Sequence, residues 1–170
     1  PANYSFNRGD AHIIAMRDII FTEVDNPSIY QTGFTDEQLA WLEADLANVS
    51  KDKLIILCVH IQIYNNSRES LQAALKILNK FSNVHILSGH WHRNRNYEHS
   101  VEGSSHTNIY EHNISAVCGS WWSSNIAGDG APNGYKIFEI EGNQIVNWYF
   151  QGIPDGMDNK NYQMRLYRGN

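Results

Sequence analysis

The sequence is short of charged residues, and the basic ones form no cluster. Lysine and arginine total 13 against 18 aspartates and glutamates, so the 170 residues carry a net charge of −5. A nucleic-acid surface needs grouped Lys and Arg, because phosphate contacts supply most of its affinity. We therefore expect no nucleic-acid-binding surface.

Cysteines and long apolar runs are also scarce. The two cysteines, Cys58 and Cys118, each lie in an apolar stretch, and we expect free core thiols rather than a disulfide. No stretch approaches the roughly 20 apolar residues of a membrane-spanning helix, and no signal-peptide pattern is present. With 42% hydrophobic residues, the chain is expected to form one globular domain.

The apolar periodicity predicts an α/β protein. A hairpin with a glycine in its turn is expected over 4–16, and a helix follows the capping-box sequence at 35–38 and ends within 49–52. The apolar runs 54–59 and 84–88 are expected to be strands that are covered on both faces. A helix of about 67–80, capped by Asn65-Asn66-Ser67, would connect them, and this order favours parallel pairing.

The remaining segments predict a β-rich C-terminal part. Turn-forming and polar residues predict loops over 22–34, 93–108 and 128–134. Apolar alternation predicts strands over 113–118, 135–141 and 144–150. The last two strands are separated by Glu141-Gly142-Asn143, which is typical of a hairpin.

Three histidines follow the two central strands. His60 ends the first apolar run, and His90 and His92 follow the second run within Gly89-His90-Trp91-His92. Ligands of open α/β sheets bind beyond the carboxyl ends of the strands, so these imidazoles are expected near one another. Since neutral imidazole is the commonest metal ligand, the pattern predicts that His60, His90 and His92 are part of a metal site.

Other residues near this site each have two interpretations. Arg93 and Arg95 follow the histidines directly and are either contacts for a phosphate or solvated loop residues. Trp121 and Trp122 are either a stacking wall for a ligand or part of the core. Asp18 follows a predicted strand and is either close to the site or a turn residue.

The other histidines are expected to be structural or exposed. His106 and His112 lie in polar sequence and are taken as surface residues, with substrate contact or a hydrogen bond to a metal-binding side chain as the alternative. His12, His85 and His99 are taken as structural or solvent-facing. No nucleophile-elbow, Walker or dinucleotide-binding glycine motif occurs.

Together these segments resemble the second half of a calcineurin-like metallophosphoesterase domain. The resemblance is carried by the hairpin at 4–15, the helix at 37–46, the strand that ends on His60, and Gly89-His90-Trp91-His92, which matches the family's Gly-His-x-His motif. Further likeness to the C-terminal region of a bacterial subgroup comes from Trp121-Trp122, 129–135 and 162–165. Members of that subgroup are often exported, so the resemblance also points to a periplasmic or secreted location.

The resemblance implies a fold and a division of the chain. The family fold is an αββα sandwich of two mixed sheets with flanking helices, of which this chain would form a part. Residues 1–150 would be the C-terminal half of the phosphoesterase domain. Residues 151–170 would lead into a C-terminal extension.

The resemblance also implies an activity and its cofactors. The family hydrolyses phosphomonoesters or phosphodiesters with a hydroxide that bridges two divalent ions, such as manganese, iron or zinc. By position, His60 and His90 would bind one ion and His92 the other. The partner of the intact protein would be a phosphoester substrate.

Two departures from the family pattern shape the expectation for this chain. The usual proline after the strand is missing, because the sequence there is His60-Ile61-Gln62. We also take the family's N-terminal motifs, Asp-x-His, Gly-Asp-x-x-Asp and Gly-Asn-His, to be missing. We therefore expect a fragment with little or no activity alone, which associates with itself through exposed sheet edges. The alternative is a non-catalytic module that binds carbohydrate or protein through Trp121 and Trp122.

Overall fold

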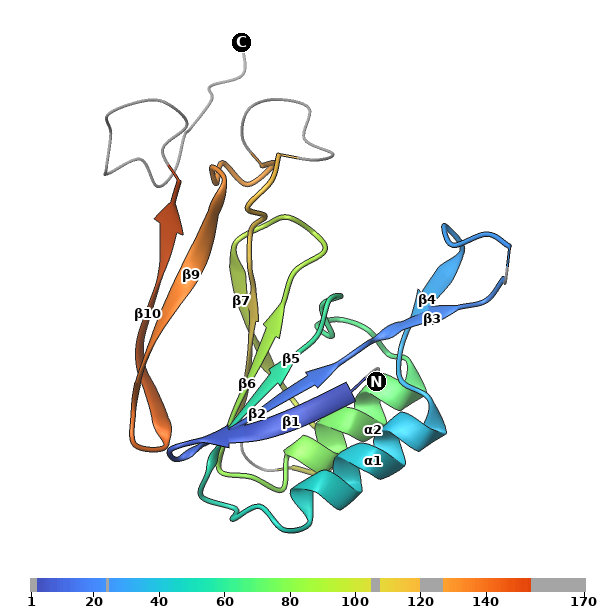
Figure 1. Ribbon diagram of the computed structural model, residues 1–170, viewed down its shortest axis with the longest axis vertical. Helices are drawn as coiled ribbons and strands as arrows, with labels where there is room; N and C mark the ends of the chain where they lie inside the picture. Colours follow the sequence, from blue (N-terminus) through green and yellow to red (C-terminus); the bar gives the residue numbers. More distant parts are fainter. Residues whose placement is uncertain (1–2, 24, 105–107, 120–126, 154–170) are drawn as a thin grey trace.

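The structure is a computed structural model that describes residues 3–23, 25–104, 108–119 and 127–153. Its centre is a six-stranded mixed sheet in the order β1-β2-β5-β6-β8-β7 (Figure 1). These strands are β1 (Asn3–Arg8), β2 (Ala11–Met16), β5 (Leu54–Cys58), β6 (Asn83–Ser88), β7 (Arg95–His99) and β8 (Ile109–Asn113). The expected α/β class is thus confirmed, and the sheet with its two helices is consistent with part of a calcineurin-like fold.

The four inner strands of this sheet are parallel, as the strand–helix–strand order predicts. Strand β5 pairs with β2 on one side and with β6 on the other, and β6 pairs in turn with β8. The two outer strands, β1 and β7, run antiparallel to their neighbours. The carboxyl ends of the inner strands therefore meet at one edge of the sheet, where the loops with the predicted ligands begin.

Two helices, α1 (Asp36–Leu46) and α2 (Glu69–Leu78), cover one face of the sheet (Figure 1). Their apolar faces join the sheet in one core, which includes Leu42, Leu46, Leu71, Leu75, Ile55, Leu57 and Ile86. The predicted capping box is confirmed, since Thr35 Oγ1 accepts from the Gln38 amide and the Gln38 side chain accepts from the Thr35 amide.

The predicted ends of both helices need correction. Helix α1 ends at Leu46, before the predicted 49–52. Helix α2 begins after an N-cap at Arg68, which has no side-chain capping bond. Asn66 does not cap the helix; its Oδ1 accepts from the Arg68 amide at 3.1 Å, because it closes a turn just outside the helix.

A long hairpin of β9 (Gly134–Glu141) and β10 (Gln144–Gly152) packs on the opposite face of the sheet. Its turn confirms the predicted hairpin, and Gly142 has φ +57°, which glycine adopts without strain. Asn143 fastens this turn to the sheet: its Nδ2 donates to the Asp52 carbonyl at 2.7 Å, and its carbonyl accepts from Asn83 Nδ2 at 2.8 Å.

The predictions for three segments of the chain were wrong. The predicted loop 22–34 contains β4 (Tyr30–Thr32), which pairs with β3 (Ile19–Phe21) in a projecting hairpin (Figure 1). The predicted loop 93–108 contains the edge strand β7. The strand predicted at 113–118 lies earlier, at 109–113. It was misplaced because its polar residues are buried against specific partners, and these residues interrupt the apolar pattern in the sequence.

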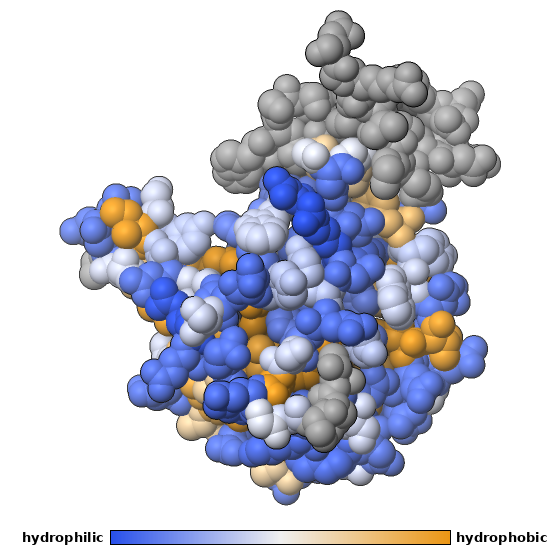
Figure 2. All heavy atoms as spheres, turned by 180° about the vertical axis from the view of Figure 1, so that it is seen from behind, coloured by the Kyte–Doolittle hydropathy of each residue, from blue (hydrophilic) through white to orange (hydrophobic). Residues whose placement is uncertain are grey.

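Neither cysteine forms a disulfide, as expected, but they are not both core residues. Cys58 is half-buried and Cys118 is exposed. No helix in the described ranges has the length and apolar character that a membrane crossing requires. Seen from behind, hydrophilic residues cover most of the described surface, interrupted by small hydrophobic patches (Figure 2).

Two histidines form a buried pair beneath the β9–β10 hairpin. His85 and His112 are 4% and 1% exposed, so the expectation that His112 lies on the surface was wrong. His85 Nδ1 lies 2.9 Å from His112 Nε2, and the planes of the two rings differ by 6°, with centroids 5.2 Å apart, so the rings meet edge to edge. Trp148 and Phe138 of the hairpin pack edge-on against His112, with ring centroids 5.0 Å away. The pair therefore belongs to the contact between hairpin and sheet.

The hydrogen bonds around this pair determine its tautomers. Asn96 Oδ1 accepts from Lys136 Nζ at 2.7 Å and lies 2.9 Å from His112 Nδ1. His112 Nδ1 must therefore carry the proton, and its Nε2 accepts from His85 Nδ1. Burial lowers the pKa of His85 from 6.5 to about 4, and burial with the Lys136 charge lowers the pKa of His112 to about 3.

The neutral pair predicts a loss of stability in acid. Below pH 6.5 the unfolded chain binds protons that the folded pair excludes, so the free energy of unfolding falls as the pH drops from 6.5 towards 4. Each histidine contributes about 1.4 kcal/mol per pH unit. Urea unfolding at several pH values should show this slope, and His85→Gln and His112→Gln should each remove about half of it. An unchanged slope in both variants would contradict the assignment.

Candidate functional site

Two of the three predicted metal ligands lie together at the carboxyl edge of the sheet. The loops after β5 and β6 run side by side, because the Gly89 amide donates to the His60 carbonyl at 3.0 Å and the Val59 amide donates to the Leu87 carbonyl at the same distance. His60 Nε2 lies 3.3 Å from His90 Nδ1, with ring centroids 5.1 Å apart at 76°. The parallel register thus brings His60 and His90 together.

The spacing of these two nitrogens fits a shared metal ion. Two nitrogens bound to one tetrahedral zinc at about 2.0–2.1 Å lie roughly 3.3–3.4 Å apart. The 3.3 Å between His60 Nε2 and His90 Nδ1 has this length, and it is long for a hydrogen bond. The donor set and its spacing therefore fit a divalent ion that prefers imidazole.

The third imidazole is on the same loop but does not complete a ligand cluster. Burial and then the charges of His60 and His92 lower the pKa of His90, so His92 is near enough to act on it. No group of three or more His, Cys, Asp or Glu side chains in the described ranges is arranged to hold a metal ion. The described site is thus a pair of imidazoles with a third nearby.

Backbone strain is concentrated on the histidines of this loop. His90 and His92 have φ values of +65° and +51°, in the left-handed region that side chains other than glycine rarely adopt. The Trp91 amide donates to the Gly89 carbonyl at 2.7 Å, which makes a γ-turn centred on His90. Such strain is typical of functional loops and persists only where the surroundings enforce it.

One buried carboxylate holds the start of the His60 loop. Asp18 is 0% exposed, and its two oxygens accept from the His60 amide at 3.0 Å and from the Ile61 amide at 2.8 Å. Burial raises the pKa of Asp18, and the bonds from these two amides oppose that rise. Of its two interpretations, the structure supports the first, since Asp18 lies close to the site and holds the backbone of His60.

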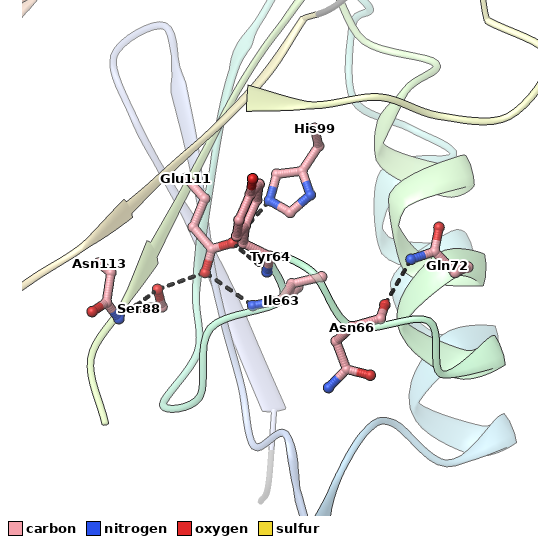
Figure 3. A network of polar contacts seen from close by, with 8 residues as sticks. All are labelled: Ile63, Tyr64, Asn66, Gln72, Ser88, His99, Glu111 and Asn113. Carbon is pink, nitrogen blue, oxygen red and sulfur yellow. Dashed lines mark hydrogen bonds and ion pairs between the residues drawn. The ribbon is translucent and has the colours of Figure 1, made fainter. Parts of the chain in front are cut away.

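A second buried carboxylate holds the rest of this loop (Figure 3). Glu111 of β8 accepts from the Ile63 amide at 2.9 Å and from the Tyr64 amide at 2.8 Å. It also accepts from Ser88 Oγ at 2.6 Å and contacts His99 Nε2 at 2.8 Å. The loop after β5 is therefore attached to the sheet through Glu111.

The Gly-His-x-His loop has its own attachments. Asn113 Nδ2 donates to the Gly89 carbonyl and, at 3.2 Å, to Ser88 Oγ. The Asn94 amide donates to Asp129 Oδ2 at 2.5 Å, which ties the predicted loop 128–134 to the chain just after His92. Sequence analysis missed Glu111, Asn113 and Asp129, because each acts through the backbone of a distant loop and no local pattern marks such a bond.

A cavity of about 370 Å³ opens beside His60. It is lined by Tyr4, Ala15, Met16, Arg17, Cys58, Val59 and His60. Arg17 is the one basic residue of this lining, and sequence analysis missed it. Burial raises the pKa of the Cys58 thiol, so the thiolate form that would bind a metal is disfavoured.

The other residues with two interpretations are placed as follows. Arg93 and Arg95 are exposed, on the chain that leaves the Gly-His-x-His loop. The ring of Tyr30, from the projecting β3–β4 hairpin, lies edge-on to His90 at 6.3 Å. Trp121, Trp122 and His106 lie outside the described residues.

One match to the family's Asp-x-His motif, Asp10-Ala11-His12, was overlooked in the sequence analysis. It lies at the amino end of β2, where Ala11 pairs with Leu54, whereas His60 follows the carboxyl end of β5. His12 Nε2 contacts Asp45 Oδ2 at 2.7 Å, so this histidine joins the hairpin to helix α1. The motif is therefore structural here.

Comparison with known families identifies the last part of the chain. Residues 111–170 match the family described as C terminal of Calcineurin-like phosphoesterase. This segment is therefore similar to the C-terminal region of calcineurin-like phosphoesterases, which supports the resemblance. No curated protein matches the chain. The matched segment includes Glu111 and Asp129, whereas His60, His90 and His92 precede it.

The strained turn at His90 predicts an unusual order of stabilities. Glycine adopts a positive φ without strain, so His90→Gly should be more stable than His90→Ala by about 1 kcal/mol. Urea unfolding of the two variants at pH 7 measures the difference directly. At Trp91, whose φ is not positive, the same pair of substitutions should favour alanine. Equal stability of the two His90 variants would contradict the left-handed turn.

Proposed function

We propose that this chain is part of a metal-dependent phosphoesterase in which His60 and His90 bind one divalent ion and His92 serves a neighbouring ion. The supporting observation is the 3.3 Å between His60 Nε2 and His90 Nδ1, which fits shared coordination, beside a C-terminal region of the phosphoesterase family. A bound ion of this kind polarises phosphoester oxygens and lowers the pKa of a water molecule. Manganese, iron and zinc all accept imidazole ligands.

The division of the chain follows from this proposal. Residues 1–150 are the C-terminal half of the catalytic domain, and 151–170 lead into a C-terminal extension. The described imidazoles are too few to hold two ions, because no carboxylate in the described ranges joins them in a metal-binding cluster. We therefore propose that this fragment binds one ion and has little or no hydrolytic activity alone.

The basic residues near the imidazoles are the proposed contacts for the phosphoester anion. Arg93 and Arg95 follow the Gly-His-x-His loop and are exposed to solvent. Arg17 joins them, because it lines the cavity that reaches His60. An arginine pairs with phosphate oxygens through two parallel hydrogen bonds, which orients the anion as well as binding it.

Zinc titration tests the proposal. Calorimetric titration of zinc into the chain should show one site, because the paired imidazoles are already at ligand spacing. His60→Ala and His90→Ala should each weaken binding by about 10-fold or more. Arg93→Gln is the matched control on the same loop and should bind zinc as the unchanged chain does.

A phosphatase assay with added manganese or zinc tests the statement on activity. Turnover at or near background is the expected result for the chain alone. Strong turnover that His90→Ala abolishes would overturn the inactive-fragment proposal while supporting the family. Zinc binding that neither histidine substitution changes would overturn the metal site.

We also propose that the chain associates with itself through the outer edge of the six-stranded sheet. Strand β1 is an edge strand, and Tyr4 and Phe6 on one of its faces are 57% and 47% exposed. An uncovered edge with large apolar side chains favours pairing with another strand.

Light scattering tests this association. The chain should be larger than a monomer at micromolar concentration, and Phe6→Lys should shift it towards the monomer, because the charge opposes edge pairing. Phe21→Lys is the control, since Phe21 is 49% exposed on the separate β3–β4 hairpin. A clean monomer for the unchanged chain would contradict the proposal.

A further inference from the structure

We propose that Glu111 is a positioning residue that sets the distance between His60 and His90. The inference rests on the proposed function, in which these two imidazoles share an ion. Glu111 itself lies on β8, a strand that contributes no ligand, and its carboxylate is 0% exposed. It cannot touch a substrate from this position and acts through the backbone of other segments.

The argument begins with one oxygen atom. Glu111 Oε1 accepts from the Ile63 amide at 2.9 Å and from Ser88 Oγ at 2.6 Å. Ile63 lies three residues after His60, and Ser88 lies two residues before His90. A single atom thus joins the loop that carries His60 to the last residue of β6, just before the loop that carries His90 (Figure 3).

The second oxygen fixes the carboxylate itself. Glu111 Oε2 accepts from the Tyr64 amide at 2.8 Å and lies 2.8 Å from His99 Nε2, a ring that is 6% exposed. Two contacts to each oxygen occupy the carboxylate with donors from three different segments. Because a carboxylate has no hydrogen to donate, it suits this place, whereas an amide would direct an N–H towards one of the donors.

The other attachments of the loops do not replace this link. Asp18 holds only the His60 loop, through the His60 and Ile61 amides. Asn113 holds only the end of β6 and Gly89. The Gly89 amide also joins the two segments directly, through its bond to the His60 carbonyl. Of these buried side chains, however, Glu111 alone bonds to both segments, so its loss should loosen the spacing of the two imidazoles while the backbone bond remains.

The first test needs no metal. In the metal-free chain, the rings of His60 and His90 are close enough for a nuclear Overhauser effect between their protons. Glu111→Gln should weaken or abolish this effect, and Ser88→Ala should weaken it, because it removes only the bridging hydroxyl. Ser5→Ala is the matched control, since Ser5 Oγ donates to Asp45 at the same 2.6 Å on another part of the sheet.

The second test is a double-mutant cycle on zinc affinity. Glu111→Gln should weaken zinc binding about 10-fold, as the loss of a residue that orients a metal ligand does. In the His60→Ala background the same substitution should cause no further loss, because there is no second imidazole left to position. A purely structural role would lower the affinity in both backgrounds.

The outcomes separate this inference from the proposed function. Unchanged ring contacts and zinc affinity in folded Glu111→Gln and Ser88→Ala would overturn the inference alone. If Glu111→Gln abolishes the contact between the His60 and His90 rings, but the unchanged chain binds no zinc, the role of Glu111 is supported and the metal site is overturned. If Glu111→Gln does not fold, Ser88→Ala decides on both measurements.

Discussion

The structure depends on buried carboxylates that accept from backbone amides of the loop after β5. Strand pairing ends at Cys58, so the amides of the following loop, among them those of His60, Ile61, Ile63 and Tyr64, need other acceptors. Asp18 and Glu111 provide them, and the loop is held without any regular secondary structure of its own. This support permits the unfavourable backbone of the neighbouring loop, because a γ-turn at His90 would relax if the chain beside it were free.

The two faces of the sheet have different physical characters. The face towards α1 and α2 is a largely apolar core, with the Glu111 contacts near its carboxyl edge and the His12–Asp45 contact near its amino edge. The opposite face carries the His85–His112 pair, whose charged forms are excluded by burial under the β9–β10 hairpin. Glu111 on one face and the His85–His112 pair on the other are thus buried with polar partners, and these contacts connect segments distant in sequence.

Local patterns predicted the framework of this fold well. The capping box, the parallel strands β5 and β6 and the final hairpin all follow from short-range signals in the sequence. The pairing of His60 with His90 followed from the rule on strand ends, and the structure brings these two together. Strand β8 was misplaced because Glu111 and His112 are polar yet buried, and their partners lie in other segments. Such residues cannot be recognised until the tertiary contacts are known.

The family match begins at Glu111, which lies inside β8 rather than between two elements. Strand β8 is an interior strand, with β6 on one side and β7 on the other. The boundary of the matched region is therefore not a boundary of folding: excising residues 111–170, or exchanging them for those of another protein, would divide a strand and leave β6 and β7 without their common neighbour. A chimera that preserves the fold would have to be joined ahead of Asn108, whose carbonyl already accepts from the Val84 amide at 3.0 Å.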